Sequence, residues 1–281
     1  MEPKNPTTLI GEVLSSPGPR KGPIEESIPH TPEMAEDSGG VLIIGGQTAW
    51  MWVADGASDM HTVGGFSSRI LAQEIGRHFV ARVLEQPEIS SISKTLIQNH
   101  FENAVRLTAE SWTSRLNRDA NLAADLKQKL AEWQKRSGGA DKASVFFEFA
   151  STYSAACLDA EGNLTGISVG DSYLMSNPNG LLQFFALKKG SVTLRLKLEN
   201  NEPVFSVSVP TPETFENQNV HLAILATDGT RETFQHLQKT LPPEFFLTPK
   251  NFAGFRKALG SAVPKTQDDK TLAWLGRINA G

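Results

Sequence analysis

Residues 222–234, "LAILATDGTRETF", contain an apolar run that stops at an aspartate. Five apolar residues, 222–226, precede Thr227, Asp228 and Gly229. A short apolar run that ends at a turn signal is typical of a buried strand, and Asp-Gly is a common turn pair. We therefore expect a buried strand here with a carboxylate at its end.

The same pattern recurs at several other strand ends. A single acid of this kind is explained by a turn, and turns account well for Asp141, Asp159 and Glu161. Because so many strand ends carry acids, a joint explanation is favoured, in which the strands lie side by side and their ends converge on one edge. The other places are "AED" (35–37), "VADG" (53–56), "SVGDS" (168–172) and "TQDDKT" (266–271).

The order of the expected elements indicates the fold class. A strand hairpin is expected over 39–58, and helical periodicity follows from Phe66, over 91–116 and over 122–136. Strands return over 144–185 and in a hairpin over 191–210, and the strand at 220–226 precedes helices over 231–238 and 250–259 and a last strand over 270–278. This order predicts an α+β fold with antiparallel sheets.

Composition excludes several classes of protein. The chain has 281 residues, 39% hydrophobic and 21% charged residues and a net charge of −4, which is ordinary for a soluble globular protein. The acidic balance gives no reason to expect nucleic-acid binding, and no apolar run is long enough to span a membrane. The single cysteine, Cys157, favours a reducing compartment, so we expect a cytoplasmic monomer without a signal peptide.

The N-terminal part differs from the rest. Residues 1–35 carry seven prolines, among which lie strand-like pieces such as "TLIGEVL". We expect residues 1–32 to form a proline-rich arm, partly flexible or added as an edge strand, and residues 33–281 to form one domain.

Clustered carboxylates repel one another and stay ionised together when cations neutralise them. Oxygen ligands without cysteine or histidine suit Mg²⁺, Mn²⁺ or Ca²⁺ better than Zn²⁺. Gly56 lacks a side chain, so its carbonyl can approach a metal closely. Two such ions about 3.5–4 Å apart could bind a bridging water, lower its pKa and direct it at a phosphorus atom.

In their order along the chain, these motifs resemble those of the metal-dependent type 2C (PPM) serine/threonine protein phosphatases. The matching stretches span about residues 33–278, and the chain looks like a divergent, bacterial-type member. The resemblance implies a four-layer α-β-β-α sandwich of two antiparallel sheets flanked by helix pairs. The stretches that match the family motifs are "AED", "VADGAS…GGFSS", "STYSAACLD…GISVGDSYL", "LAILATDG" and "DDKT".

The resemblance also implies roles for individual residues around two Mn²⁺ or Mg²⁺ ions and a weaker third. Asp55 would bridge the two ions, with Asp228 and Asp268 as the other acids that act through the metal-activated water. Asp269 takes a supporting role. The full implied metal set is Glu36, Asp37, Asp55, Gly56, Asp171, Asp228, Glu232 and Asp268, of which Glu36 and Asp37 act through metal-bound waters, and Asp171 and Glu232 belong to the third site.

The sequence departs from the family pattern at positions that contact substrate. Many members have a phosphate-binding arginine where this chain has Pro32. We expect Arg20 to replace it, with Lys21 and Arg69 as alternatives. Ala57 stands where some members have a proton-donating histidine, as in many bacterial-type members.

Two functions of different kinds follow from this pattern. The first is a phosphatase that hydrolyses phosphoserine and phosphothreonine in a protein substrate, by attack of a water that bridges the two ions. The alternative is a pseudophosphatase that uses the same fold for binding or sensing, which the missing arginine and the altered loops favour. Every core acid is present, which favours the enzyme. Hydrolysis of p-nitrophenyl phosphate with Mn²⁺, with and without EDTA, separates the two.

Overall fold

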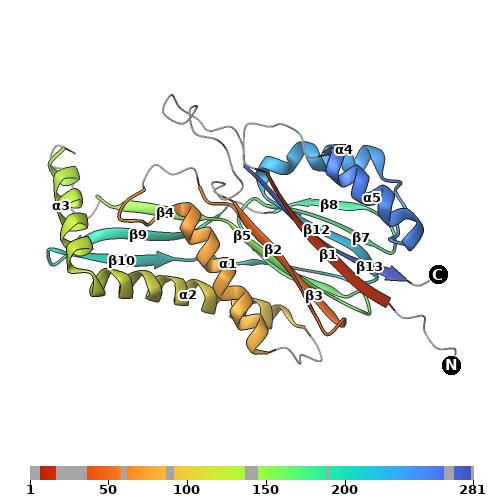
Figure 1. The fold of residues 1–281 in the computed structure, drawn as a ribbon, viewed down its shortest axis with the longest axis horizontal. Helices are drawn as coiled ribbons and strands as arrows, with labels where there is room; N and C mark the ends of the chain where they lie inside the picture. The colour runs from red at the N-terminus through yellow and green to blue at the C-terminus, as the bar shows by residue number, and fades with distance from the viewer. Residues whose placement is uncertain are drawn as a thin grey trace.

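Two five-stranded antiparallel sheets pack face to face in the computed structural model, which describes residues 7–16, 37–57, 62–86, 92–136, 145–187, 190–262 and 269–279 (Figure 1). The first sheet has the strand order β1 (Thr7–Ser16), β13 (Lys270–Asn279), β12 (Val220–Ala226), β7 (Tyr173–Pro178), β8 (Gln183–Ala186). The second has the order β11 (Glu213–Asn217), β6 (Leu164–Val169), β5 (Tyr153–Asp159), β3 (Thr48–Ala54), β2 (Ser38–Ile44).

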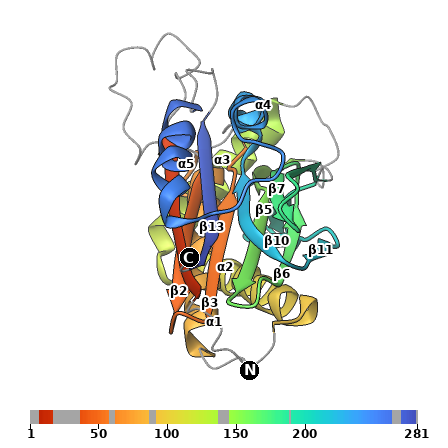
Figure 2. The ribbon, with the colours of Figure 1, turned by 90° about the vertical axis from the view of Figure 1, so that its right-hand side faces the viewer.

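Helix pairs cover the two outer faces. The first sheet is covered by α4 (Arg231–Thr240) and α5 (Pro249–Ala262), and the second by α1 (Ser68–Glu85) and α2 (Lys94–Arg118) (Figure 2). This is the predicted four-layer α-β-β-α sandwich, and the antiparallel pairing of neighbouring strands confirms the predicted fold class.

The period-2 alternation of the strands explains the layers. In β12, Ala223 and Leu225 face the other sheet, whereas Leu222 and Ile224 face the helices α4 and α5. Strands buried on both faces read as continuous apolar runs, which is why "LAILA" shows no alternation of polar residues.

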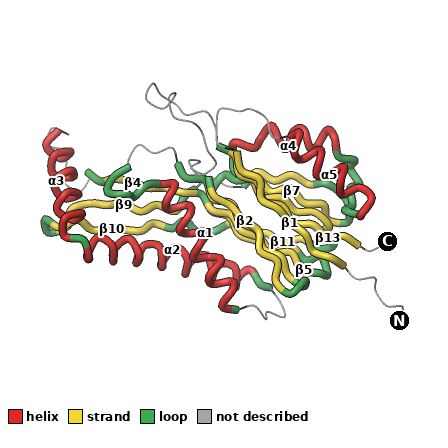
Figure 3. Tube along the Cα trace, in the orientation of Figure 1, coloured by secondary structure: helices red, strands yellow, loops and turns green. Residues whose placement is uncertain are grey.

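A third, three-stranded sheet extends beyond the sandwich, as Figure 3 shows. It has the order β10 (Glu202–Ser208), β9 (Val192–Glu199), β4 (Phe147–Ser151), and α3 (Ala120–Arg136) packs beside it. The predicted hairpin over 191–210 is thus β9 and β10. The alternating run that begins at residue 144 is not one strand, because the chain leaves this sheet at Thr152 and continues as β5 in the second large sheet.

The N-terminal strand β1 belongs to the first sheet. It pairs with β13 over ten residues, from Thr7 opposite Asn279 to Ser16 opposite Lys270, and Leu9 is buried between the two large sheets. Residues 17–36 lie outside the described part of the chain, so a domain boundary at residue 32 stays a prediction. In the described ranges, no helix is long and apolar enough to cross a membrane.

Candidate metal centre

Antiparallel pairing brings the acid-bearing strand ends to one edge of the sandwich. In the second sheet, Ser38 at the start of β2 lies opposite Ala54 at the end of β3. In the first sheet, Ala226 at the end of β12 lies opposite Leu272 of β13 and Tyr173 of β7. The residues just beyond these positions are the acids of the sequence motifs, so register alone gathers them within each sheet.

A hydrogen bond joins the acid ends of the two sheets. The hydroxyl of Thr227, at the end of β12, donates to Oδ2 of Asp37, just before β2, at 2.6 Å. The same hydroxyl oxygen accepts the backbone N–H of Thr271 at 3.0 Å, and the backbone N–H of Thr227 donates to the carbonyl of Thr271 at 2.9 Å. Asp37 is 6% exposed and Thr227 is fully buried, so this bond lies inside the protein.

The backbone around Asp55 is fixed by the segment that joins β4 to β5. Its N–H donates to the hydroxyl of Thr152 at 3.1 Å, and its carbonyl accepts the N–H of Thr152 at 2.9 Å. Gly56 forms an isolated antiparallel bridge with Ser151, and the N–H of Ala57 donates to a carbonyl at residue 150 at 3.0 Å. The "VADG" turn is thus held along three successive residues.

The acids at this edge contact one another. The carboxyl groups of Asp37 and Asp228 act on that of Asp55 through their charges, and they are its hydrogen-bond partners when one carboxyl of a pair carries a proton. Burial raises the pKa of Asp37 to about 7, a rise that the hydrogen bond from Thr227 opposes and the charges of Asp269 and Asp228 increase. Burial also raises the pKa of Asp55 strongly, and the charges of Asp37 and Asp228 raise it further. These shifts indicate carboxyl groups that are buried close to one another.

The donor set fits a hard divalent cation, because the groups in contact are all carboxylate oxygens and no thiol or imidazole stands among them. Among the described residues, no three His, Cys, Asp or Glu side chains form a group that could hold a metal ion. Two of the predicted ligands, Glu36 and Asp268, lie outside those residues. Asp37, Asp55 and Asp228 all belong to the predicted ligand set, and their roles as metal ligands stay predictions.

The remaining predicted metal residues lie around this edge. Asp171 is partly exposed in the turn between β6 and β7, where Gly170, at φ +126°, packs against Thr152. Asp228 begins a 3-10 turn (Asp228–Thr230), and Glu232 is exposed in the first turn of α4. None of their ligand roles is tested by these positions, so those roles stay predictions.

Of the expected phosphate-binding cations, Arg20 and Lys21 lie outside the described residues. Arg69, the second residue of α1, is partly buried, and its Nε finds no hydrogen-bond partner in the described part of the chain. The hydroxyl of the neighbouring Ser68 accepts a hydrogen bond from the N–H of Ala150 at 3.1 Å. The carbonyl of Ala150 in turn accepts the N–H of Ala57. The first turn of α1 is therefore attached to the same backbone segment as the "VADG" turn.

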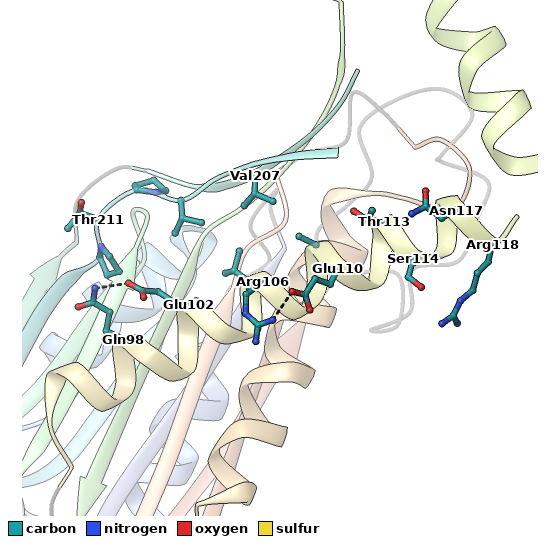
Figure 4. Close-up of a pocket in the computed structure, with 15 residues that line it drawn as sticks. Gln98, Glu102, Arg106, Glu110, Thr113, Ser114, Asn117, Arg118, Val207 and Thr211 are labelled. Carbon is teal, nitrogen blue, oxygen red and sulfur yellow. Dashed lines mark hydrogen bonds and ion pairs between the residues drawn. The ribbon is translucent and has the colours of Figure 1, made fainter. Parts of the chain in front are cut away.

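A separate groove of about 800 Å³ runs between α2 and the chain that follows β10 (Figure 4). None of the clustered acids lines it. Its walls are mixed, with Val105 and Val207 beside the ion pair of Arg106 and Glu110. The groove is thus distinct from the carboxylate edge.

Comparison with known proteins decides the family. A family model described as protein phosphatase 2C matches residues 30–257. The chain belongs to this family. No curated protein matches the sequence at a significant level. The phosphatase 2C match spans the motifs up to α5, which include every predicted metal residue except Asp268.

Solved structures show the same fold at low identity. The chain is 10% identical to a structure of the phosphatase domain and a regulatory fragment of SpoIIE from Bacillus subtilis, with a TM-score of 0.52, covering 99% of this chain and 65% of that one. It is 15% identical to the structure of a C. elegans sex-determining protein, with a TM-score of 0.50. The match covers 96% of this chain and 65% of that one. The catalytic domain of PstP in complex with two manganese ions is 13% identical to this chain, with a TM-score of 0.49. The match covers 97% of this chain and 100% of that one.

Sequence reasoning missed the residues that hold the acids in place. Thr227 and Thr152 lie inside the stretches "LAILATDG" and "STYSAACLD", but neither carries a catalytic signature. For Thr227 a signal was present, namely a hydroxyl residue at the end of an apolar strand immediately before an acid. For Thr152 no turn residue such as glycine or proline in the surrounding sequence marks the point where β4 ends and β5 begins.

Proposed function

We propose that this chain is a metal-dependent protein phosphatase that hydrolyses phosphoserine and phosphothreonine monoesters. The observation that carries the proposal is the interaction of the Asp55 carboxyl group with those of Asp37 and Asp228, three acids from motifs far apart in the sequence, which raises the pKa of Asp55. Membership of the phosphatase 2C family supports the same function. Asp55, Asp228 and Asp268 are the proposed catalytic acids.

The proposed metal set completes the cluster. It comprises two Mn²⁺ or Mg²⁺ ions and a weaker third, held by Glu36, Asp37, Asp55, Gly56, Asp171, Asp228, Glu232 and Asp268. When bound, such ions supply a water of lowered pKa and positive charge opposite the phosphate.

The protein's own contribution is to hold these oxygens in place. Asp55 is fixed through its backbone by Thr152. Asp37 is fixed through its side chain by Thr227. Thr152 lies between β4 and β5 and Thr227 directly follows β12, so the bonds that fix Asp55 and Asp37 come from the ends of different strands.

We propose that the protein acts as a cytoplasmic monomer on a phosphoprotein. The free thiol of Cys157, buried in β5, supports a reducing compartment. The mixed charge of the surface and the acidic net charge give no reason to involve nucleic acid.

The test is hydrolysis of p-nitrophenyl phosphate and of a phosphothreonine peptide, in millimolar Mn²⁺ and in EDTA. We expect turnover with Mn²⁺, none in EDTA, and recovery when Mn²⁺ is added back. Asp55→Asn should abolish turnover, whereas Asp125→Asn, an exposed acid paired with Lys129 on α3, should retain it. Turnover that persists in EDTA would contradict the metal mechanism, and a wild-type protein that binds Mn²⁺ without hydrolysing either substrate would support a pseudophosphatase.

A further inference from the structure

Thr227 is held from several sides at the point where the two sheets meet. Its N–H donates to the carbonyl of Thr271, and its own carbonyl accepts from the N–H of Thr230 at 3.1 Å and from the hydroxyl of Thr230 at 2.6 Å. The side chain is fully buried. A β-branched residue in a fixed backbone has few rotamers, so the position of its hydroxyl is set by the strand itself.

The direction of the hydroxyl proton follows from its neighbours. The oxygen accepts the N–H of Thr271 at 3.0 Å, so its single proton is available to one acceptor. Oδ2 of Asp37 lies at 2.6 Å, whereas the carbonyl of Thr271 lies at 3.3 Å. The shorter contact to a carboxylate is the stronger one, because hydrogen bonds to ionised acceptors are shorter and stronger than neutral ones.

We propose that Thr227 is a positioning residue of the metal centre, which fixes Asp37 through one carboxylate oxygen and so orients it toward Asp55. This inference rests on the proposed function. The bond spans 190 residues of sequence and joins β12 of the first sheet to the entry of β2 in the second. Thr227 therefore couples the relative position of the two sheets to the geometry of the acids.

The consequence is a selective effect on metal affinity. Residues that orient metal ligands by hydrogen bonds typically change metal affinity by about 10–100-fold when they are removed. Thr227→Val keeps the β-branched shape and removes the hydroxyl, so Asp37 loses its donor. Thr227→Ser keeps the hydroxyl and should restore affinity to within about threefold of the wild type.

The experiment is calorimetric titration of the full-length protein with Mn²⁺, with folding checked by circular dichroism. We expect Thr227→Val to raise the Kd for Mn²⁺ by about 10-fold or more. The matched control is Thr108→Val, which removes another fully buried threonine hydroxyl, bonded to the carbonyl of Ala104 at 2.9 Å on α2. This control should bind Mn²⁺ as the wild type does.

A double-mutant cycle tests whether Thr227 acts through Asp37. In an Asp37→Ala background, Thr227→Val should raise the Kd by less than about twofold, because the acceptor is already gone. If Thr227→Val does not fold, Thr227→Cys carries the same test, since a thiol is a weak donor.

The outcomes separate this inference from the proposed function. A wild type that binds no Mn²⁺ overturns both. A wild type that binds Mn²⁺ and hydrolyses substrate, together with an unchanged Kd in Thr227→Val or an equal effect in the Asp37→Ala background, overturns the role of Thr227 alone.

Discussion

Asp228 lies at the start of a single 3-10 turn, exposed on the surface of the carboxylate edge and in contact with Asp55. An acid in this position contributes charge to the site and little to the core. Asp37 is the opposite case, since it is buried and held by Thr227. Substitution of these two acids should therefore separate metal binding from folding.

Asp228→Asn should abolish activity and leave the fold intact. Removal of one negative charge from a site that holds two dications weakens metal binding. We therefore expect kcat/KM in Mn²⁺ to fall by more than about 100-fold, which exceeds the usual loss when a residue that only orients a metal ligand is removed. Circular dichroism should be unchanged, and Asp125→Asn serves as the control. A variant with near wild-type turnover would exclude Asp228 as a direct ligand.

The second residue-scale prediction concerns the cation that binds the substrate phosphate. Loss of a charged hydrogen bond costs about 1.5–3 kcal/mol, so Arg20→Ala or Arg69→Ala should lower kcat/KM on a phosphopeptide by roughly 10- to 100-fold, largely through KM. In the described part of the chain the Nε of Arg69 finds no hydrogen-bond partner, and the residue lies in the helix turn that is attached to the segment holding the "VADG" turn.

Arg77→Ala, on the same helix as Arg69 and highly exposed beside Glu74, is the matched control. If neither Arg20→Ala nor Arg69→Ala changes kcat/KM by more than about threefold, neither arginine replaces the one that stands at Pro32 in the family.

At the scale of an element, β1 closes the edge of the first sheet. Its ladder with β13 is ten residues long, and the hydroxyls of Ser15 and Thr271 lie 3.0 Å apart at the end near the acids. The proline-rich N-terminal arm, which we expected to be partly flexible or added as an edge strand, thus contains a strand at the edge of the first sheet.

Deletion of residues 1–16 should destabilise the protein. Loss of a buried leucine side chain alone costs about 2–5 kcal/mol, and Leu9 is buried between the sheets. At about 2–4 °C per kcal/mol for a chain of this size, Tm should fall by at least about 5 °C. Deletion of residues 1–6, which precede the strand, should change Tm little. Equal Tm values for the two truncations would contradict a structural role for β1.

At the scale of the whole molecule, stability without metal should depend on pH in an unusual direction. The folded-state pKa of Asp37 is about 7, and that of Asp55 is also raised, above an unfolded value of about 3.9. The folded protein then binds more protons than the unfolded chain. This contribution to stability is complete below about pH 4 and is lost as the pH rises through 7, by at most about 1.4 kcal/mol per pH unit for each proton.

In EDTA, Tm should therefore fall between pH 6 and pH 8, and Asp55→Asn should show a shallower fall. In millimolar Mn²⁺ the trend should reverse, because the metal binds the deprotonated carboxylates and stabilises the folded state by mass action. Thermal unfolding across this pH range measures both effects. Parallel curves in EDTA and in Mn²⁺ would count against a metal site at this edge.

Periodicity and turn chemistry were sufficient to predict most elements, because both act over a few residues. The strand at 220–226, the hairpin over 191–210 and the helices α4 and α5 were predicted near their observed bounds. The ordered acid motifs predicted the family, which the family match over residues 30–257 confirms. The third sheet was not predicted. The alternating stretch that begins at residue 144 divides into β4 and β5 at Thr152, and this break depends on which strands pair with each of the two.

Local sequence patterns specify that acids end the strands and which fold the strands form. The packing of the two sheets specifies which acids interact and what holds them. Asp37 and Thr227 are 190 residues apart, and their bond exists because antiparallel register places one at the start of β2 and the other at the end of β12, and packing of the sheets brings these ends together. Local periodicity carries no information on such a contact, because it depends on how two separately formed sheets pack.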